Sequence, residues 1–239
     1  MTKEEFVARC PKLFHSFART LADRNGYYMV QFAVEWAENL VDKPLLDAGC
    51  GAKSTLSRCQ PSLRQLVGLD PLRDSLRENP HVDWKVQGVL ENLPFHAESF
   101  DAVYSDSVFE HLGDPAKACR EFYRVLKPGG RVLINTNSIF NPFMFPNKFL
   151  SISMRERLKN VLSIDNAGTF HAPYRANTKA RLKRYLRRAG FHHLRFYRWG
   201  LPGMMQPKWF LALELGMELL SEIPIFGGLK HRLMVTAEK

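Results

Sequence analysis

The sequence predicts an α/β fold built on a mostly parallel sheet. Short apolar segments of strand length alternate along the chain with helical segments, as in repeated strand–helix–strand units. The clearest strand, Pro44 to Asp47, runs directly into the turn Gly49-Cys50-Gly51. A second apolar strand, Gln65 to Asp70, follows about 20 residues later and also ends in an acid. The order predicts two neighbouring strands whose carboxyl ends meet at a glycine turn.

This glycine turn has the composition of a ligand site. Gly49 and Gly51 lack a Cβ, so the backbone can take a positive φ and a ligand can approach it closely. A helix that begins near Lys53 would direct free N–H groups toward an anionic group. Asp47 can accept from a cationic or hydroxyl partner, and Asp70 stands where an acid commonly binds the ribose hydroxyls of a nucleotide-like cofactor.

The other elements follow from spacing and from stop signals. Two N-terminal helices are expected, from Thr2 to Ala22 and from Tyr27 to Leu40, because apolar residues recur at helical spacing on both sides of Asn25-Gly26. Later helices are expected from Pro71 to Asn79, from Asp114 to Leu126, from Asn177 to Ala189 and from Trp209 to Ile223. The remaining strands are expected over residues 82–87, 100–105, 131–136, 191–199 and 232–237.

Four blocks downstream of the turn carry a family resemblance. LPF, SFDAV, EHL and RVLKPGG follow one another between Leu93 and Gly130. With the D-x-G-C-G turn and Asp70, they resemble class I S-adenosylmethionine-dependent methyltransferases of the methyltransferase domain type 11-like group, closely over Leu45–Thr136 and loosely to the C-terminus. The resemblance implies a Rossmann-like, seven-stranded, mostly parallel sheet with helices on both faces, N-terminal helices and lid insertions after strands five and six. We expect one domain, with an N-terminal helical cap (1–42), a cofactor-binding core (43–136) and substrate lids (137–178 and 200–229).

The resemblance implies S-adenosyl-L-methionine as the cofactor. Its expected contacts come from the turn and from the loops after strands two, three and four: Asp47, Gly49, Cys50, Gly51, Lys53, Asp70, Pro71, Val89, Leu90 and Ser105. Lys53 replaces a glycine that the family often has, and it can place a cation near the cofactor's carboxylate. The family's adenine-binding acid would fall at Val89, with Glu91 two residues later, so that acid is either lost or displaced.

The acceptor is expected beyond strands four and five. His111 in the EHL block and His171 in HAPYRANT are candidate general bases for a hydroxyl nucleophile, and a structural role is the alternative for both. The long insertion after strand five contributes candidate substrate contacts: Phe140, Phe143, Tyr174 and Arg175. The segment YSDS (104–107) differs from the Asn-Pro-Pro-Tyr of relatives that methylate adenine or amide nitrogens, which argues against those acceptors.

The charge is unevenly distributed. The net charge of the 239 residues is +10, and residues 151–200 hold the whole excess, with twelve Lys or Arg against two acids. Such a localised field attracts anions, so an acidic substrate, a phosphorylated carrier, nucleic acid or a lipid headgroup are candidates. The alternative is a solvated, arginine-rich helix face. Glu214, Glu218 and Glu222 form an acidic stripe on the last helix, which favours a lid or a subunit contact, as in a homodimer, over a membrane anchor.

Composition limits the remaining choices. No signal segment is visible at the N-terminus, and no apolar run reaches the length of a membrane span. The four cysteines have no CxxC or metal-type spacing. We therefore expect a reduced, cytoplasmic protein. The preferred function is metal-independent methyl transfer to a small-molecule acceptor, at oxygen, with anionic acceptors included. The alternatives are an RNA-directed or carrier-directed methyltransferase that uses residues 151–200, and a non-catalytic S-adenosylmethionine-binding protein.

Overall fold

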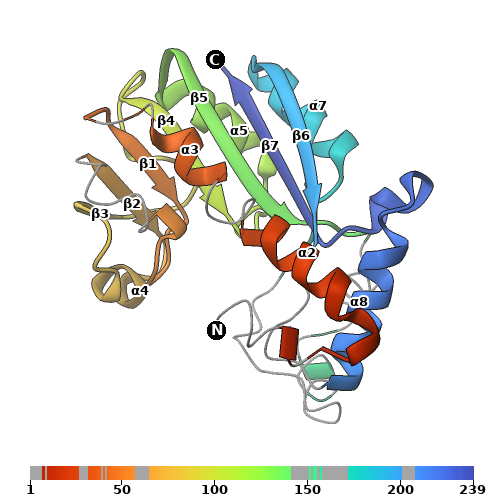
Figure 1. The fold of residues 1–239 in the computed structure, drawn as a ribbon. Coiled ribbons are helices and arrows are strands. Elements are labelled where there is room, and N and C mark those ends of the chain that lie inside the picture. Colours follow the sequence, from red (N-terminus) through yellow and green to blue (C-terminus); the bar gives the residue numbers. More distant parts are fainter. Residues whose placement is uncertain are drawn as a thin grey trace.

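The structure, a computed structural model, contains a seven-stranded sheet of order β3-β2-β1-β4-β5-β7-β6 (Figure 1). It describes residues 7–8, 10–26, 32–38, 40, 42–56, 65–140, 151, 153–154, 157, 172–200 and 208–239. The strands are β1 (Leu45–Ala48), β2 (Leu66–Asp70), β3 (Trp84–Gln87), β4 (Phe100–Asp106), β5 (Leu126–Asn137), β6 (His192–Trp199) and β7 (Arg232–Glu238). β7 is antiparallel to both of its neighbours, β5 and β6, and every other pairing is parallel. The predicted fold class is confirmed.

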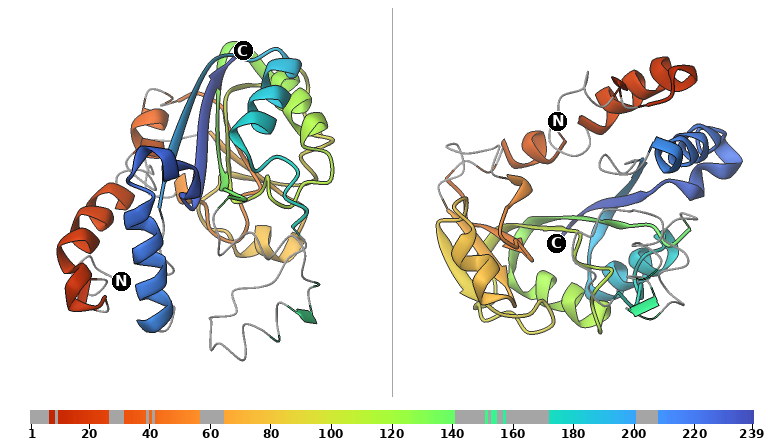
Figure 2. Two further views of the ribbon diagram at one scale, coloured as in Figure 1. Left: turned by 90° about the vertical axis from the view of Figure 1, so that its right-hand side faces the viewer. Right: turned by 90° about the horizontal axis from the view of Figure 1, so that it is seen from below.

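Helices cover both faces of the sheet (Figure 2). The helices are α2 (His15–Gly26), α3 (Phe32–Glu38), α4 (Arg73–Glu78), α5 (Pro115–Val125), α7 (Lys179–Ala189) and α8 (Lys208–Leu220), with 3-10 turns η1 (Lys12–Phe14) and η5 (Pro224–Leu229). Side chains of α5 and α7 form one buried core with one face of the strands, and α3 closes the other core. Successive strand residues alternate between the two cores, as Leu46 and Leu45 do in β1.

The sheet brings the carboxyl ends of β1, β2, β4 and β5 to one edge, which lies low in Figure 1. Strand order reverses between β1 and β4, because β2 and β3 extend to one side of β1 while β4 and β5 extend to the other. Ligands of open α/β sheets bind at such a reversal, outside the carboxyl ends of the strands. The fold therefore places the glycine turn after β1 and the end of β4 at the same crevice.

The first predicted helix is interrupted, because Val7 and Ala8 are helical but the helix does not continue through Pro11. Residues Thr2 to Ala22 were expected to form one helix, but α2 starts at His15 after the short turn η1. Pro11, which precedes η1, is extended, with φ −57° and ψ 141°. Proline has no N–H to donate and cannot continue a helix that enters from its N-terminal side, so the long prediction is wrong at this residue.

Helix α8 buries acidic side chains and exposes apolar ones, which is the reverse of a usual amphipathic helix. Glu214 and Glu218 are 7% and 5% exposed, and Lys230 pairs with Glu218 and Glu222, at 3.1 and 2.5 Å. Trp209 and Leu213 on the outer side are about half exposed, at 50% and 54%. Two of the three acids of the stripe therefore face inward while Glu222 is exposed, so the stripe no longer favours a lid or a subunit contact over a membrane anchor. In the part of the chain that the structure describes, no helix is both long and apolar enough to cross a membrane.

Candidate active site

The turn after β1 is held against the end of β2. The amides of Gly49 and Cys50 both donate to the Leu69 carbonyl, at 2.7 and 3.2 Å. Gly49 and Gly51 have φ of +86° and +54°, in the left-handed region that favours glycine. A Cβ on Gly51 would meet nothing within 4 Å, whereas one on Gly49 would lie 2.2 Å from a methyl of Val108. The turn thus leaves open space beside Gly51, as a cofactor cradle requires.

Asp70 joins this turn to the second strand. One of its oxygens accepts from the Gly51 amide and the other from the Leu72 amide, both at 2.9 Å. Asn79 donates to the carbonyl of Gly51, also at 2.9 Å. A carboxylate oxygen accepts two hydrogen bonds, so each Asp70 oxygen retains capacity for a hydroxyl group. Asp70 therefore lies beside the turn with acceptor capacity left, and its binding of a sugar stays a prediction.

Asp47 is a buried acid beneath the turn. It is 2% exposed, and within the described part of the chain it bonds to the Ser54 hydroxyl and to no lysine or arginine. Its pKa is raised from 3.8 to about 7: burial is the largest cause, the charges of Asp106 and Asp70 add to it, and the Ser54 hydrogen bond opposes it. Three carboxylates therefore converge where a ligand would lie. S-adenosylmethionine carries a sulfonium and an ammonium, so these residues fit it electrostatically.

We expect Asp47→Asn to remove a pH dependence of stability. Between pH 3.8 and about 7 the native state keeps a proton that the unfolded state has lost, so stability falls as pH rises through this window. The loss amounts to up to about 4 kcal/mol at 1.36 kcal/mol per pKa unit. The asparagine does not ionise, so between pH 5 and pH 8 the free energy of unfolding of the variant should rise relative to that of the wild type. Urea unfolding of the cofactor-free protein measures this difference. An equal difference at both pH values would contradict this.

The loops after β2 and β3 hold the other expected cofactor contacts. Pro71 and Val89 are exposed, whereas Leu90 is buried. Val89 forms an isolated bridge with Asn92, which bends the loop back on itself. Glu91 accepts from the Asp114 amide at 3.4 Å, so its carboxylate lies at the start of α5. The structure therefore places the Glu91 carboxylate near the N-cap of α5, and whether it contacts the adenine stays a prediction.

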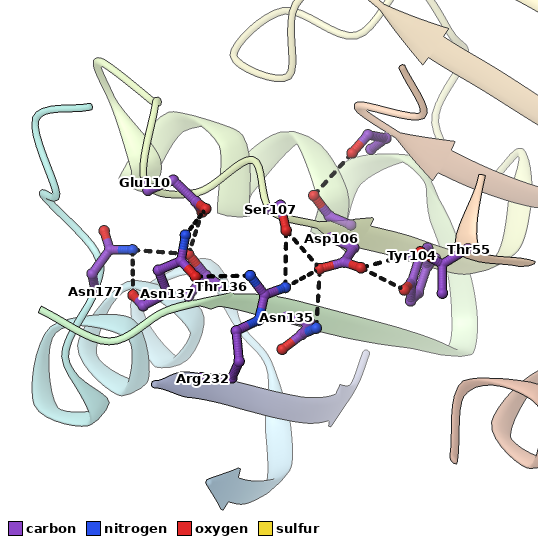
Figure 3. Close-up of polar contacts among 12 residues, drawn as sticks. Thr55, Tyr104, Asp106, Ser107, Glu110, Asn135, Thr136, Asn137, Asn177 and Arg232 are labelled. Carbon is purple, nitrogen blue, oxygen red and sulfur yellow. Dashed lines mark hydrogen bonds and ion pairs between the residues drawn. The ribbon is translucent and has the colours of Figure 1, made fainter. Parts of the chain in front are cut away.

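The carboxyl ends of β4 and β5 and the amino end of the antiparallel β7 carry a polar cluster that we name the Asp106 cluster (Figure 3). One Asp106 oxygen accepts from Arg232, Asn135 and Ser107, the last two at 3.0 Å. The other oxygen accepts from Thr55 at 3.2 Å and from Tyr104 at 3.4 Å. Thr55 follows the glycine turn, so the cluster reaches the cofactor side directly.

Arg232 links β7 to this cluster. Its guanidinium also donates to Ser107 and Asn137, at 2.9 and 2.8 Å, and lies 5.6 Å from the centre of the Trp199 ring. Arg232 is 7% exposed, and among the described residues neither its Nε nor the side-chain oxygen of Asn135 has a hydrogen-bond partner. Ser107 has a φ of +61°, which is uncommon for serine. A buried, partly unsatisfied polar group of this kind is unusual away from functional sites.

A second network surrounds Glu110 of the EHL block. Its carboxylate accepts from Thr136 and Asn137, both at 2.6 Å, and Asn177 extends the network to the start of α7 (Figure 3). Glu110 is 2% exposed, whereas His111 is exposed on the turn after β4. The buried polar member of this pair is the acid.

The remaining predicted site residues are spread around the same edge. Ser105 is buried and donates to the Ala48 carbonyl at 2.9 Å, so its hydroxyl joins β4 to β1. Burial raises the pKa of the Cys50 thiol to about 12. Lys53 and Phe140 are exposed, and Arg175 donates to the Gly113 carbonyl at 2.6 Å. Tyr174 is buried at a φ of +51°. Phe143 and His171 lie outside the described residues.

Sequence reasoning missed several members of the polar clusters. Asp106 follows Ser105 in the segment YSDS, and Ser105 is predicted as the site residue instead. Which of two neighbours in a strand faces the ligand depends on the orientation of the strand, which the sequence does not specify. Arg232 lies 126 residues after Asp106 and has no local motif. Its only sequence signal is a cation at the start of a strand that is otherwise apolar.

Comparison with known proteins agrees with this geometry. Residues 46–134 match the family model described as a methyltransferase domain. The chain is 30% identical over 166 residues to the ubiquinone/menaquinone biosynthesis C-methyltransferase UbiE of Vibrio vulnificus, covering 59% of this chain and 63% of that protein. It is 37% identical over 95 residues to a malonyl-[acyl-carrier protein] O-methyltransferase of Erwinia pyrifoliae, covering 38% of this chain and 36% of the relative.

A solved structure supports the fold over nearly the whole chain. The crystal structure of the YcgJ protein from Bacillus subtilis superimposes with a TM-score of 0.60 at 18% identity, covering 89% of this chain and 98% of that one. The two curated relatives are matched over less than two thirds of their own length, so they support the family and not an acceptor. Residues 46–134 therefore match a methyltransferase domain, and the strand order and glycine turn give the chain the fold of S-adenosylmethionine-dependent methyltransferases, whose cofactor is S-adenosyl-L-methionine.

Proposed function

We propose that the protein transfers a methyl group from S-adenosylmethionine to an oxygen of a small-molecule acceptor, without a metal ion. The observation that carries this proposal is the pair of polar groupings on the two sides of the strand-order reversal, at the carboxyl edge of the sheet. The glycine turn and Asp70 lie on one side, and the Asp106 cluster lies on the other, with Thr55 bonded to Asp106 between them. Polar side chains beyond the cofactor suit a polar acceptor group.

The residues contribute binding and orientation. When bound, the cofactor supplies a methyl group on a positively charged sulfur, which is already activated. Asp70 holds the sugar of the nucleoside beside the open space at Gly51, and Asp47 and Asp106 supply negative charge near the cation. The fixed hydrogen bonds of Asp106 keep the acceptor side ordered before binding, which lowers the entropic cost of alignment. His111 and His171 remain the proposed bases for the acceptor hydroxyl, and Phe140, Phe143, Tyr174 and Arg175 the proposed acceptor contacts.

A carrier-bound or nucleic-acid acceptor is the second candidate. Helix α7 favours it, because its exposed side holds six cations: Lys179, Arg181, Lys183, Arg184, Arg187 and Arg188. The relative from Erwinia pyrifoliae, which is named for a carrier-protein substrate, agrees with this reading. Methyl transfer that weakens steeply as salt rises would favour this candidate, since charged surfaces are screened by salt. A small-molecule acceptor predicts a weak dependence.

The test begins with cofactor binding. Isothermal titration with S-adenosylmethionine should show one site, and Asp70→Asn should weaken it by about 10-fold to 100-fold, since hydrogen bonds to charged groups contribute about 1.5–3 kcal/mol. Asp74→Asn, an exposed acid on α4, is the matched control and should bind as the wild type does. Absence of binding would overturn the proposal. Binding without transfer of a labelled methyl group to any cell-extract fraction would favour the third candidate, a non-catalytic binding protein.

A further inference from the structure

Two adjacent histidines and a glutamate meet at the edge of the sheet far from the glycine turn. His192 is the first residue of β6, and its Cα partner in the antiparallel neighbour β7 is Glu238. Successive residues of a regular strand point to opposite faces of the sheet. His192 and His193 should therefore diverge, and a regular strand would bring at most one of them to Glu238.

A backbone irregularity cancels this alternation. The register between β6 and β7 shifts between His192 and Arg195, and His193 has a φ of +50°. The two imidazole rings consequently lie 4.6 Å apart, centre to centre, with an interplanar angle of 81°. A left-handed conformation is unfavourable for a residue with a Cβ, and such positions cluster where function requires them.

The donor atoms converge as well as the residues. One ring nitrogen from each histidine and one Glu238 oxygen all lie within 4.8 Å of one another, and all three residues are exposed. In a tetrahedral zinc site with ligand distances of about 2.0–2.2 Å, donors stand about 3.3 Å apart. Small side-chain rotations close the difference. The geometry points to a site for a divalent transition metal of the zinc class, formed by His192, His193 and Glu238.

The site is separate from the methyl-transfer crevice. Glu238 pairs across the sheet with Arg131, and β5 runs from there to its carboxyl end at Asn137 beside the Asp106 cluster. Figure 1 shows the C-terminus at the opposite end of the sheet from that edge. An ion here therefore takes no part in the proposed chemistry, and it would join β6 to β7 at the end where their register is broken.

The neighbouring charges define the rest of the coordination shell. His193 and Glu238 line a pocket on the α3 side of the sheet together with Glu35, Arg131 and Arg195. Three protein ligands leave a fourth position open on zinc. The two arginines lower the affinity for a bare cation, and they favour an anionic fourth ligand such as hydroxide, chloride or a carboxylate.

The test is a metal titration of the full chain. Zn²⁺ should bind in a 1:1 ratio in competition with a chromogenic chelator, and Co²⁺ should give the intense visible bands of a tetrahedral site. His192→Ala, His193→Asn and Glu238→Gln should each weaken binding by at least about 10-fold, which is the smallest loss usually seen when even a group that only hydrogen-bonds to a metal ligand is removed. Asparagine tolerates the left-handed conformation, so His193→Asn keeps the backbone.

Two comparisons make the outcome decisive. His96→Ala, at an exposed histidine distant in sequence, should bind Zn²⁺ as the wild type does. Zn²⁺ at 100 times its dissociation constant should raise the urea midpoint of the wild type, because a ligand that binds only the native state stabilises it, and should not do so for His193→Asn. Absence of stoichiometric binding, or equal affinity in wild type and all three ligand variants, would overturn the inference.

Discussion

Alanine at Gly49 should destabilise the protein far more than alanine at Gly51, while the second change should weaken cofactor binding more selectively. A Cβ on Gly49 would lie 2.2 Å from the Val108 side chain, and the residue has a φ of +86°. The stability of Gly49→Ala is therefore lowered by two effects, a left-handed backbone strain of about 1–2 kcal/mol and an overpacking cost of about 1–3 kcal/mol. Gly51 has the strain alone, since its Cβ would meet nothing within 4 Å.

The second half of this prediction locates the cofactor. The new methyl of Gly51→Ala would project into the open space beside the turn, where we place S-adenosylmethionine. Urea unfolding should therefore show a loss of about 2–5 kcal/mol for Gly49→Ala and about 1–2 kcal/mol for Gly51→Ala. Calorimetry on the folded Gly51→Ala variant should show affinity reduced by at least 10-fold, about 1.4 kcal/mol. Wild-type affinity in that variant would place the cofactor elsewhere.

The double variant Gly49→Ala/Val108→Ala separates sterics from strain. Val108 packs against the main core, so Val108→Ala alone has its own cost and serves as the reference. If the clash dominates, the glycine change should be less costly in the Val108→Ala background than in the wild type. Equal costs in both backgrounds would show that the backbone conformation decides.

Local patterns predicted the first two strands of the sheet and the glycine turn between them well, for a physical reason. The turn, Asp47 and Asp70 belong to two short strands whose apolar runs and glycine spacing are visible within 27 consecutive residues, 44 to 70. The strands of the core were each predicted to within a few residues, because burial on both faces leaves only apolar residues acceptable there. Pro11 was also a local sign that the first helix is interrupted, but the helical spacing of the apolar residues around it was given more weight.

The orientation of α8 could not be predicted in the same way. Its period of acidic residues identifies a helix with two faces, but periodicity does not say which face is buried. Glu218 is acceptable inside because Lys230, twelve residues later and outside the helix, pairs with it at 3.1 Å. A buried carboxylate of this kind depends on a partner from another element, and only the tertiary structure reveals that partner.

The acceptor side illustrates the same limit at the site itself. Asp106, Asn135 and Arg232 come from three strands, and their convergence follows from the sheet order, in which β7 enters between β5 and β6. No spacing along the chain encodes that neighbourhood. Residues that bind through a single turn are thus visible in a sequence, whereas residues that meet across a sheet are not.

Arg232→Met should destabilise the protein by about 3–5 kcal/mol, the usual cost of leaving one member of a buried ion pair uncompensated. Arg232 is 7% exposed, and its partner Asp106 would retain hydrogen bonds from Asn135 and Ser107 but no cation. The same loss adds uncompensated negative charge near Asp47, whose pKa Asp106 already raises. Urea unfolding at pH 8, where Asp47 is ionised, should show a larger loss than at pH 5.

The double variant Asp106→Asn/Arg232→Met distinguishes a structural link from a positioning role. It removes both charges together, so most of the lost stability should return, and a double-mutant cycle should give a coupling free energy of about 1–3 kcal/mol. Methyl transfer should not return with it, because Asp106 also fixes Thr55 at the cofactor turn and Ser107 at the acceptor side. We expect a reduced kcat with a smaller change in the KM for S-adenosylmethionine. Recovery of full turnover together with stability would mean that the pair only joins β7 to β4, and that the acceptor binds against other residues.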